Sequence, residues 1–167
     1  MIQLVVSDAG PLVALSRVRR LSLLEALFET VIIPRVVLDE LKIDEYRPGI
    51  EDLSLAIEKN SWLKVEEQGE LTPFGGLDAG ECAAIVLAER HQCPLLVDER
   101  KGRAVARKRG VDIIGTGRVL LEAKDHQLIP SVSTVLRELR KQGYRFSDRL
   151  CQRLTEHANE DFTSHPD

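Results

Sequence analysis

The feature that most constrains the fold is an alternation of short apolar runs with longer amphipathic stretches. Most of these runs are continuous, as in parallel strands that helices cover on both faces. Between them, apolar residues recur at helical spacing. This order predicts an α/β domain with a mostly parallel central sheet of about five strands. The predicted strands are Ile2–Ser7, Val31–Ile33, Trp62–Glu66, Leu95–Asp98 and Val111–Ile114.

Several residues mark where the predicted helices begin. Pro11 and Pro34 each suit a first helical position, because proline needs no N–H partner there. Ser22 is placed to cap the helix that contains LLEALF, and residues 43–51 are expected to form a loop before another helix. Two more helices are predicted near the C-terminus, over SVSTVLRELRKQG and SDRLCQRLTEHA.

The chain length sets the domain organisation that we expect. At 167 residues, one domain with a substantial core is predicted. We assign residues 1–128 to the domain core and residues 129–167 to a C-terminal helical extension packed on the same domain. No apolar run approaches the ~20 residues needed to span a bilayer, and no basic region precedes the first strand. We therefore expect a cytoplasmic protein that does not engage membranes.

Composition narrows the chemistry that the chain can support. The cysteines at positions 82, 93 and 151 are odd in number and never spaced CxxC, and the four histidines lack metal-ligand spacing. These patterns argue against a disulfide framework or a zinc knuckle. The net charge of −4 is unlike that of a protein that coats nucleic acid. The charge is uneven, however, because Arg100–Gly110 carries six positive residues and no negative one.

Two predicted strands are followed by, or end on, an aspartate. Asp8 comes directly after the first strand, in SDAGP, and Asp98 ends the fourth, in PLLVD. In a parallel sheet, functional groups gather at the carboxyl ends of the strands. Each aspartate could instead cap the next helix. A third role for Asp8, as a phosphoryl acceptor, requires a second nearby acid that SDAGP does not contain.

Helix phase adds two glutamates. Glu40 follows Val36 and Val37 by four and three residues, which places it on the apolar stripe of its predicted helix. Its neighbour Asp39 falls on the charged outer face. The alternative for Glu40 is a boundary position from which its carboxylate reaches water.

The second glutamate is Glu81, in LDAGECAAIVLAER. It precedes Ala84 and Ile85 by three and four residues, and so heads a buried stripe. Asp78 is placed to cap this helix. The alternative for Glu81 is compensation of the helix dipole, which any first-turn acid provides.

The four acids Asp8, Glu40, Glu81 and Asp98 are thus predicted to point inward or toward one rim of the sheet. Like charges this close repel and raise one another's pKa. A hard divalent cation would offset the repulsion, and oxygen-only ligands suit Mg²⁺ or Mn²⁺ better than Zn²⁺. Such ions activate water and neutralise phosphate oxygens. The pattern points to metal-dependent phosphoryl chemistry.

Four blocks of the sequence, in this order, resemble the PIN-domain family: VVSDAGPLVAL, VIIPRVVLDEL, LDAGECAAIVLA and LLVDERKGRAVARKRGVDIIGT. The resemblance covers roughly residues 2–128 and is closest to proteins related to VapC toxins. It implies a three-layer α/β/α fold and an Mg²⁺- or Mn²⁺-dependent endoribonuclease. It also implies a toxin held inactive by a cognate antitoxin. Matched by position, the catalytic metal ligands are Asp8, Glu40, Glu81 and Asp98.

The sequence departs from the family pattern at two points. Glu81 stands where many members have an aspartate. The fourth strand ends VDER, where members have a threonine followed two residues later by an aspartate. Asp98 therefore comes slightly early, and Glu99 is a possible substitute. These departures leave open a second hypothesis, a PIN-like module without nuclease activity that acts by binding protein or RNA.

The basic stretch after Asp98 is interpreted as a contact for the RNA backbone. Arg103, five residues after Asp98, is the preferred contact, and Lys101, Arg107 and Thr116 complete the predicted nucleic-acid-binding set. The alternatives are a solvated helix face for the cations and a helix cap for Thr116. The amphipathic helices near the C-terminus could contribute to a dimer surface or an antitoxin groove. A homodimer is expected.

Overall fold

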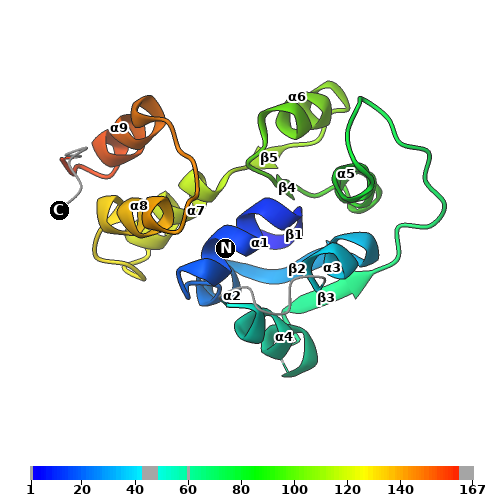
Figure 1. Ribbon diagram of the computed structural model, residues 1–167, viewed down its shortest axis with the longest axis horizontal. Helices are drawn as coiled ribbons and strands as arrows, with labels where there is room; N and C mark the ends of the chain where they lie inside the picture. Colours follow the sequence, from blue (N-terminus) through cyan, green and yellow to red (C-terminus); the bar gives the residue numbers. More distant parts are fainter. Residues whose placement is uncertain (1, 43–48, 60, 162–167) are drawn as a thin grey trace.

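The central sheet has the predicted parallel arrangement. A computed structural model describes residues 2–42, 49–59 and 61–161. In these residues a five-stranded sheet has the order β3-β2-β1-β4-β5, and every neighbouring pair is parallel (Figure 1). The expected parallel sheet of about five strands is therefore confirmed. The strands are β1 (Ile2–Ser7), β2 (Phe28–Pro34), β3 (Leu63–Glu66), β4 (Leu95–Leu96) and β5 (Ile113–Ile114).

Helices cover both faces of this sheet, which gives the three layers of an α/β/α fold. Successive strand residues point to opposite sides, so Val5 belongs to one hydrophobic cluster and Val6 to the other. α5 and α6 cover the Val6 side, and α1, α2, α7, α8 and α9 contribute to the Val5 side. The helices are α1 (Ala9–Arg17), α2 (Ser22–Leu27), α3 (Arg35–Lys42), α4 (Ile50–Lys59), α5 (Ala79–His91), α6 (Arg100–Lys108), α7 (Thr116–Asp125), α8 (Val132–Lys141) and α9 (Asp148–His157).

Several predicted helix starts were wrong in detail. Pro34 ends β2 instead of opening a helix, and Pro11 is the third residue of α1. Proline is tolerated there because the first four N–H groups of a helix have no intrahelical partner. Ser22 does not cap α2, since Leu21 before it already has helical dihedral angles. Of the expected loop over residues 43–51, residues 43–48 lie outside the described residues, and Ile50 already begins α4.

The C-terminal helices belong to the same core as the rest of the Val5 side. Leu136 and Leu139 of α8 and Leu154 of α9 join the cluster that contains Leu12 and Leu120. In Figure 1 both helices lie beside α7, away from α5 and α6. No helix in the described parts of the chain is both long enough and apolar enough to cross a membrane.

Glu160, near the end of the described chain, forms hydrogen bonds with the first turn of α8. Its carboxylate accepts hydrogen bonds from the N–H groups of Val132 and Ser133, both at 2.9 Å, and it pairs with Lys124. Burial alone would raise the pKa of Glu160. The bonds from Lys124, Ser133, Val132 and Ser131 outweigh burial and lower the pKa to about 2.

Replacing Glu160 by glutamine should therefore destabilise the protein in a pH-dependent way. The folded-state pKa lies below the ordinary value of 4.5, so the ionised carboxylate stabilises the fold above that pH. This contribution is lost as the pH falls from about 4.5 toward 2. We expect Glu160→Gln to lower the free energy of unfolding by about 1–3 kcal/mol at pH 7, measured by urea denaturation. Glu156→Gln, on the exposed side of α9, is the control. Equal losses in both variants, or a loss that does not shrink in acid, would contradict this assignment.

Candidate active site

Asp8 and Asp98 lie beyond the carboxyl ends of two neighbouring strands. β1 pairs with β4 so that Ser7 is opposite Leu96, and the Asp8 N–H donates to the Leu96 carbonyl at 3.0 Å. Asp98 comes two residues after β4 ends. The parallel pairing of β1 and β4 thus brings both aspartates to the same edge of the sheet.

Asp8 is a buried carboxylate with only 8% of its surface exposed. It occupies the N-cap position of α1, but its side chain makes no capping hydrogen bond to any described residue. Burial is the main cause that raises the pKa of Asp8 to about 6. The nearby Ala9 N–H lowers the pKa, and the charges of Glu81, Asp78 and Glu40 raise it further. Asp8 is therefore not the simple side-chain cap considered above.

Glu40 reaches this edge from α3. The residue is exposed, so the expectation that it faces inward was wrong for most of the side chain. Its carboxylate nevertheless lies against the start of α5, with Oε2 only 2.8 Å from the position that a Cβ on Gly80 would take. Glycine at position 80 makes room for this approach. Partial burial raises the pKa of Glu40, and the charges of Asp78 and Glu81 add to the rise.

Glu81 and Asp78 form a capping box at the start of α5, so the predicted Asp78 cap is confirmed. The Glu81 N–H donates to Asp78 Oδ1 at 2.8 Å, and the Asp78 N–H donates to Glu81 Oε2 at 2.9 Å. The other oxygen, Oε1, lies 3.7 Å from the position of a Cβ on Gly102, in α6. Burial raises the pKa of Glu81, and the charges of Asp78 and Glu99 add to it, whereas the Asp78 N–H and Lys101 lower it.

Asp98 does not cap the helix that follows it. Glu99 does so, by accepting from the Gly102 N–H at 2.8 Å. The Asp98 carboxylate turns instead to Thr116, the first residue of α7: Oδ1 accepts from the Thr116 N–H at 2.7 Å and Oδ2 from its hydroxyl at 2.6 Å. A third bond comes from the Tyr144 hydroxyl, at 2.9 Å from Oδ2.

The side chains at this edge of the sheet offer the kind of ligand atoms that a hard divalent cation binds. Asp8, Glu40 and Glu81 offer only carboxylate oxygens, and each has a raised pKa to which neighbouring acids contribute. A bound cation would remove that repulsion. Within residues 2–42, 49–59 and 61–161, however, no group of three or more His, Cys, Asp or Glu side chains is arranged so that it could hold a metal ion. The acids thus lie near one another, but in the described residues their carboxylates do not surround a single point at which a metal ion could bind.

The acids Asp8, Glu40, Glu81 and Asp98 are together called the acid site below. Two of the predicted RNA contacts lie at its edge. Arg103 is half-buried, donates to the Val97 carbonyl at 3.4 Å, and packs its guanidinium against Gly115. Lys101 donates to the Gly76 carbonyl at 2.6 Å, and its charge is close enough to lower the pKa of Glu81.

Of the other two predicted RNA contacts, one is exposed on α6 and the other is buried. Arg107 is exposed on α6, whereas Thr116 is completely buried. The Thr116 hydroxyl is engaged by Asp98, so any role of Thr116 in binding acts through that carboxylate. Thr116 is also not the cap of α7, because Gly115 takes the N-cap position.

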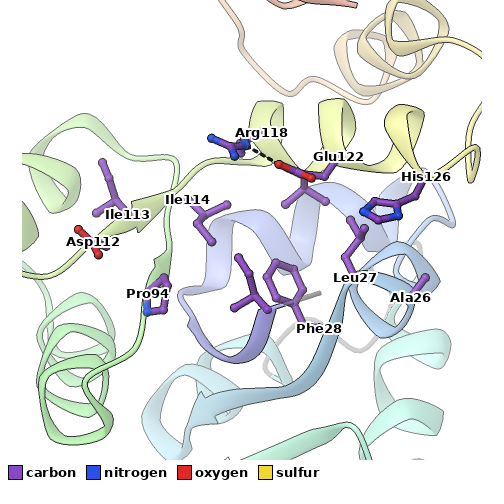
Figure 2. Close-up of a pocket in the computed structure, with 12 residues that line it drawn as sticks. Ala26, Leu27, Phe28, Pro94, Asp112, Ile113, Ile114, Arg118, Glu122 and His126 are labelled. Atoms are coloured by element: carbon purple, nitrogen blue, oxygen red, sulfur yellow. Dashed lines mark hydrogen bonds and ion pairs between the residues drawn. The ribbon is translucent and has the colours of Figure 1, made fainter.

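A cavity of about 370 Å³ lies at the opposite end of the sheet (Figure 2). Ile2 and Phe28, which begin β1 and β2, and Ile113, which begins β5, line it. Of its charged residues, Arg118 and Glu122 pair with each other at 2.8 Å, as the dashed line in Figure 2 shows, and Asp112 also lines it. The cavity therefore has no part in the chemistry of the acids.

Sequence reasoning missed two residues of this site. Asp78 was predicted only as a cap, yet its charge raises the pKa values of Asp8, Glu40 and Glu81. Tyr144 was not predicted at all, although it contacts Asp98 across 46 positions of the chain. Gly143 before it could have indicated a helix end, but no local pattern identifies so distant a partner.

Comparison with known proteins identifies one family. The sequence model of a family described as PIN domain matches residues 4–160. A PilT N-terminus domain protein from Sulfolobus solfataricus P2 has a similar structure, with a TM-score of 0.54 and 15% identity over 72% of this chain and 93% of that chain. This similarity supports the fold alone. A domain of a functionally unknown protein from Methanocaldococcus jannaschii DSM 2661 has a TM-score of 0.49 and 25% identity over 68% of this chain and 90% of that chain. No curated protein matches the chain.

The buried charge of Asp8 leads to a stability prediction. Its pKa rises from an ordinary 3.8 to about 6 on folding, so the ionised form destabilises the metal-free fold above pH 6 and has no effect below pH 3.8. Asp8→Asn should therefore raise the free energy of unfolding by about 1–3 kcal/mol at pH 8 without divalent ions, measured by urea denaturation. The gain should vanish below pH 4. The control is Asp39→Asn, exposed on α3. A variant at position 8 that is less stable than wild type at pH 8 would refute the assignment.

Proposed function

The chain belongs to the PIN-domain family, and from that membership we propose that it is an Mg²⁺- or Mn²⁺-dependent endoribonuclease of the VapC type. PIN domains are generally nucleases. The observation that carries the proposal is the Asp8 carboxylate, which is buried, makes no capping bond with its side chain to a described residue, and is repelled by three other acids. Such a group destabilises the fold unless a cation compensates it.

Asp8, Glu40, Glu81 and Asp98 would hold the metal ion. When bound, the ion would supply an activated water molecule and neutralise charge on the phosphate oxygens. The chain supplies the fixed geometry: β1 and β4 hold Asp8 and Asp98 at one edge, and Thr116 orients the Asp98 carboxylate. Glu40 and Glu81 approach from α3 and α5.

The basic residues of α6 would bind the RNA backbone beside the acids. Arg103 and Lys101 lie at the rim, and Arg107 extends the positive surface along the helix. Aromatic residues make up only 4% of the chain, which leaves little material for a platform on which bases stack. RNA would therefore be bound mainly through its phosphates.

The biological setting is part of the same proposal. The likeness to VapC toxins suggests a cytoplasmic toxin restrained by a cognate antitoxin. The apolar faces of α8 and α9 pack in the core, so the exposed sides of these helices are the candidate surfaces for that antitoxin or for a homodimer.

The hydrogen bonds that Glu81 and Asp98 already make favour a second function, a PIN-like module that binds RNA or protein without cleaving it. Glu81 uses one carboxylate oxygen in the capping box, and three hydrogen bonds engage Asp98. In the described segments the acids also do not close into a metal-binding group. Metal binding and cleavage by the wild-type protein decide between the two functions.

Asp8→Asn tests the nuclease directly. We expect the variant to fold, to lose Mn²⁺ binding in calorimetric titration, and to cleave RNA at least ~100-fold more slowly than wild type in Mg²⁺ or Mn²⁺, because it lacks the buried anionic ligand. Asp39→Asn, which changes the same functional group on the outer face of α3, should behave as wild type. Cleavage by Asp8→Asn at the wild-type rate would show that the site is misassigned. Mn²⁺ binding by a wild-type protein that does not cleave RNA would favour the binding module.

Arg107→Gln tests the proposed RNA surface. Loss of one phosphate contact should weaken the binding of all RNA sequences to a similar degree and reduce the slope of log K against log salt by about 1. Fluorescence anisotropy in Ca²⁺, at several salt concentrations, measures both quantities. Arg118→Gln, at the opposite end of the sheet, is the matched control. An unchanged salt slope for Arg107→Gln would place the RNA elsewhere.

A further inference from the structure

The C-terminal extension brings a tyrosine hydroxyl into the acid site. The Tyr144 hydroxyl donates to Asp98 Oδ2 at 2.9 Å. It also lies 3.2 Å from the position that a Cβ on Gly10 would take, in the first turn of α1. The hydroxyl therefore sits between the segment that follows β4 and the segment that follows β1, where the two aspartates lie.

The turn that ends α8 places Tyr144 at this position. α8 ends in a Schellman motif: the Gly143 N–H donates to the Arg140 carbonyl at 2.9 Å and the Tyr144 N–H to the Leu139 carbonyl at 3.0 Å. Gly143 has a φ of +83°, which favours glycine. A Cβ there would meet no described atom within 4 Å, so backbone conformation and not packing calls for glycine. This turn directs the chain from α8 back toward the sheet.

The hydroxyl and the ring of Tyr144 have separate partners. The ring packs on Phe146, with ring centroids 5.3 Å apart, and this contact needs no hydroxyl. The partner of the hydroxyl is instead the Asp98 carboxylate, to which it donates.

The bond from Tyr144 completes a set of three donors around Asp98. Thr116 supplies the other two, one to each carboxylate oxygen. An ionised carboxylate has about four acceptor sites, so three donors fix its plane and leave about one direction open. That open direction is where a cation or its bound water can approach.

We propose that Tyr144 is a positioning residue of the acid site, whose hydroxyl holds the Asp98 carboxylate in the orientation that serves the divalent ion. This proposal rests on the proposed metal-dependent function. It makes the C-terminal extension, which lies outside the four sequence blocks, a working part of the site. Tyr144 acts through Asp98 and is not assigned a contact with the substrate.

Tyr144→Phe removes the hydroxyl and keeps the ring. Residues that orient metal ligands typically change metal affinity 10–100-fold when altered, so we expect about that loss of Mn²⁺ affinity by calorimetry. The metal-free variant should still unfold cooperatively, with its thermal midpoint lowered by no more than one lost hydrogen bond accounts for. RNA cleavage should lose kcat with little change in KM. Ser131→Ala, a hydroxyl deletion at the cap of α8, should lower the thermal midpoint and leave Mn²⁺ affinity unchanged.

Gly10→Ala supplies an independent variant in case Tyr144→Phe folds poorly. A methyl group 3.2 Å from the hydroxyl should displace it and weaken Mn²⁺ binding a few-fold, although alanine favours the helix. In the Tyr144→Phe background the same substitution should have no further effect. Additive losses in the double variant would overturn the proposal.

The outcomes separate this proposal from the one on which it rests. Wild-type-like or tighter Mn²⁺ binding by Tyr144→Phe overturns the role of Tyr144 and leaves the nuclease intact. A wild-type protein that binds Mn²⁺ without cleaving RNA refutes the nuclease, while the affinity comparison still decides the role of Tyr144. A wild-type protein that binds no Mn²⁺ refutes both.

Discussion

The parallel pairing of β1 with β4 is the interaction on which the site depends. Their register places Ser7 opposite Leu96, and the next residues along each strand lead to Asp8 and Asp98. Because both strands run in one direction, their carboxyl ends open at the same edge, and the helices that follow carry the remaining groups there. A different register would separate the two aspartates and leave each as an isolated buried or half-buried charge.

The edge that results is electrostatically unfavourable in the metal-free protein. Asp8, Glu40 and Glu81 each have a raised pKa, with burial as the main cause and neighbouring acids as a further one. Elsewhere in the fold, charges are arranged to stabilise it, as at Glu160, where hydrogen bonds and Lys124 lower the pKa to about 2. The pKa values of three carboxylates are thus raised at this edge, whereas that of Glu160 is lowered. Raised carboxylate pKa values that cluster at one edge are typical of a functional site, whereas the lowered pKa of Glu160 is typical of a contact that stabilises the fold.

Most of the fold could be predicted from the sequence, because hydrophobic periodicity is a local signal. β1 had its predicted bounds, and the Asp78 cap of α5 could be predicted from its position before the helix. The errors fell at element ends. Pro34 closes a strand, and β4 stops at Leu96, although the apolar run continues to Val97. There, pairing with a neighbouring strand decides where an element ends, and a single stretch of sequence carries no record of that neighbour.

The sequence by itself determined the class of fold, the order of its elements and the four acids that reach one edge of the sheet. These follow from side-chain spacing within each element, together with the rule that parallel strands share a carboxyl edge. Only the tertiary structure decided what each acid contacts. Asp98 binds Thr116 and Tyr144 instead of capping α6, and the Glu40 carboxylate of α3 lies against Gly80 at the start of α5. Hydrogen bonds between residues 46 positions apart depend on how helices pack across the sheet, and packing is a property of the whole chain.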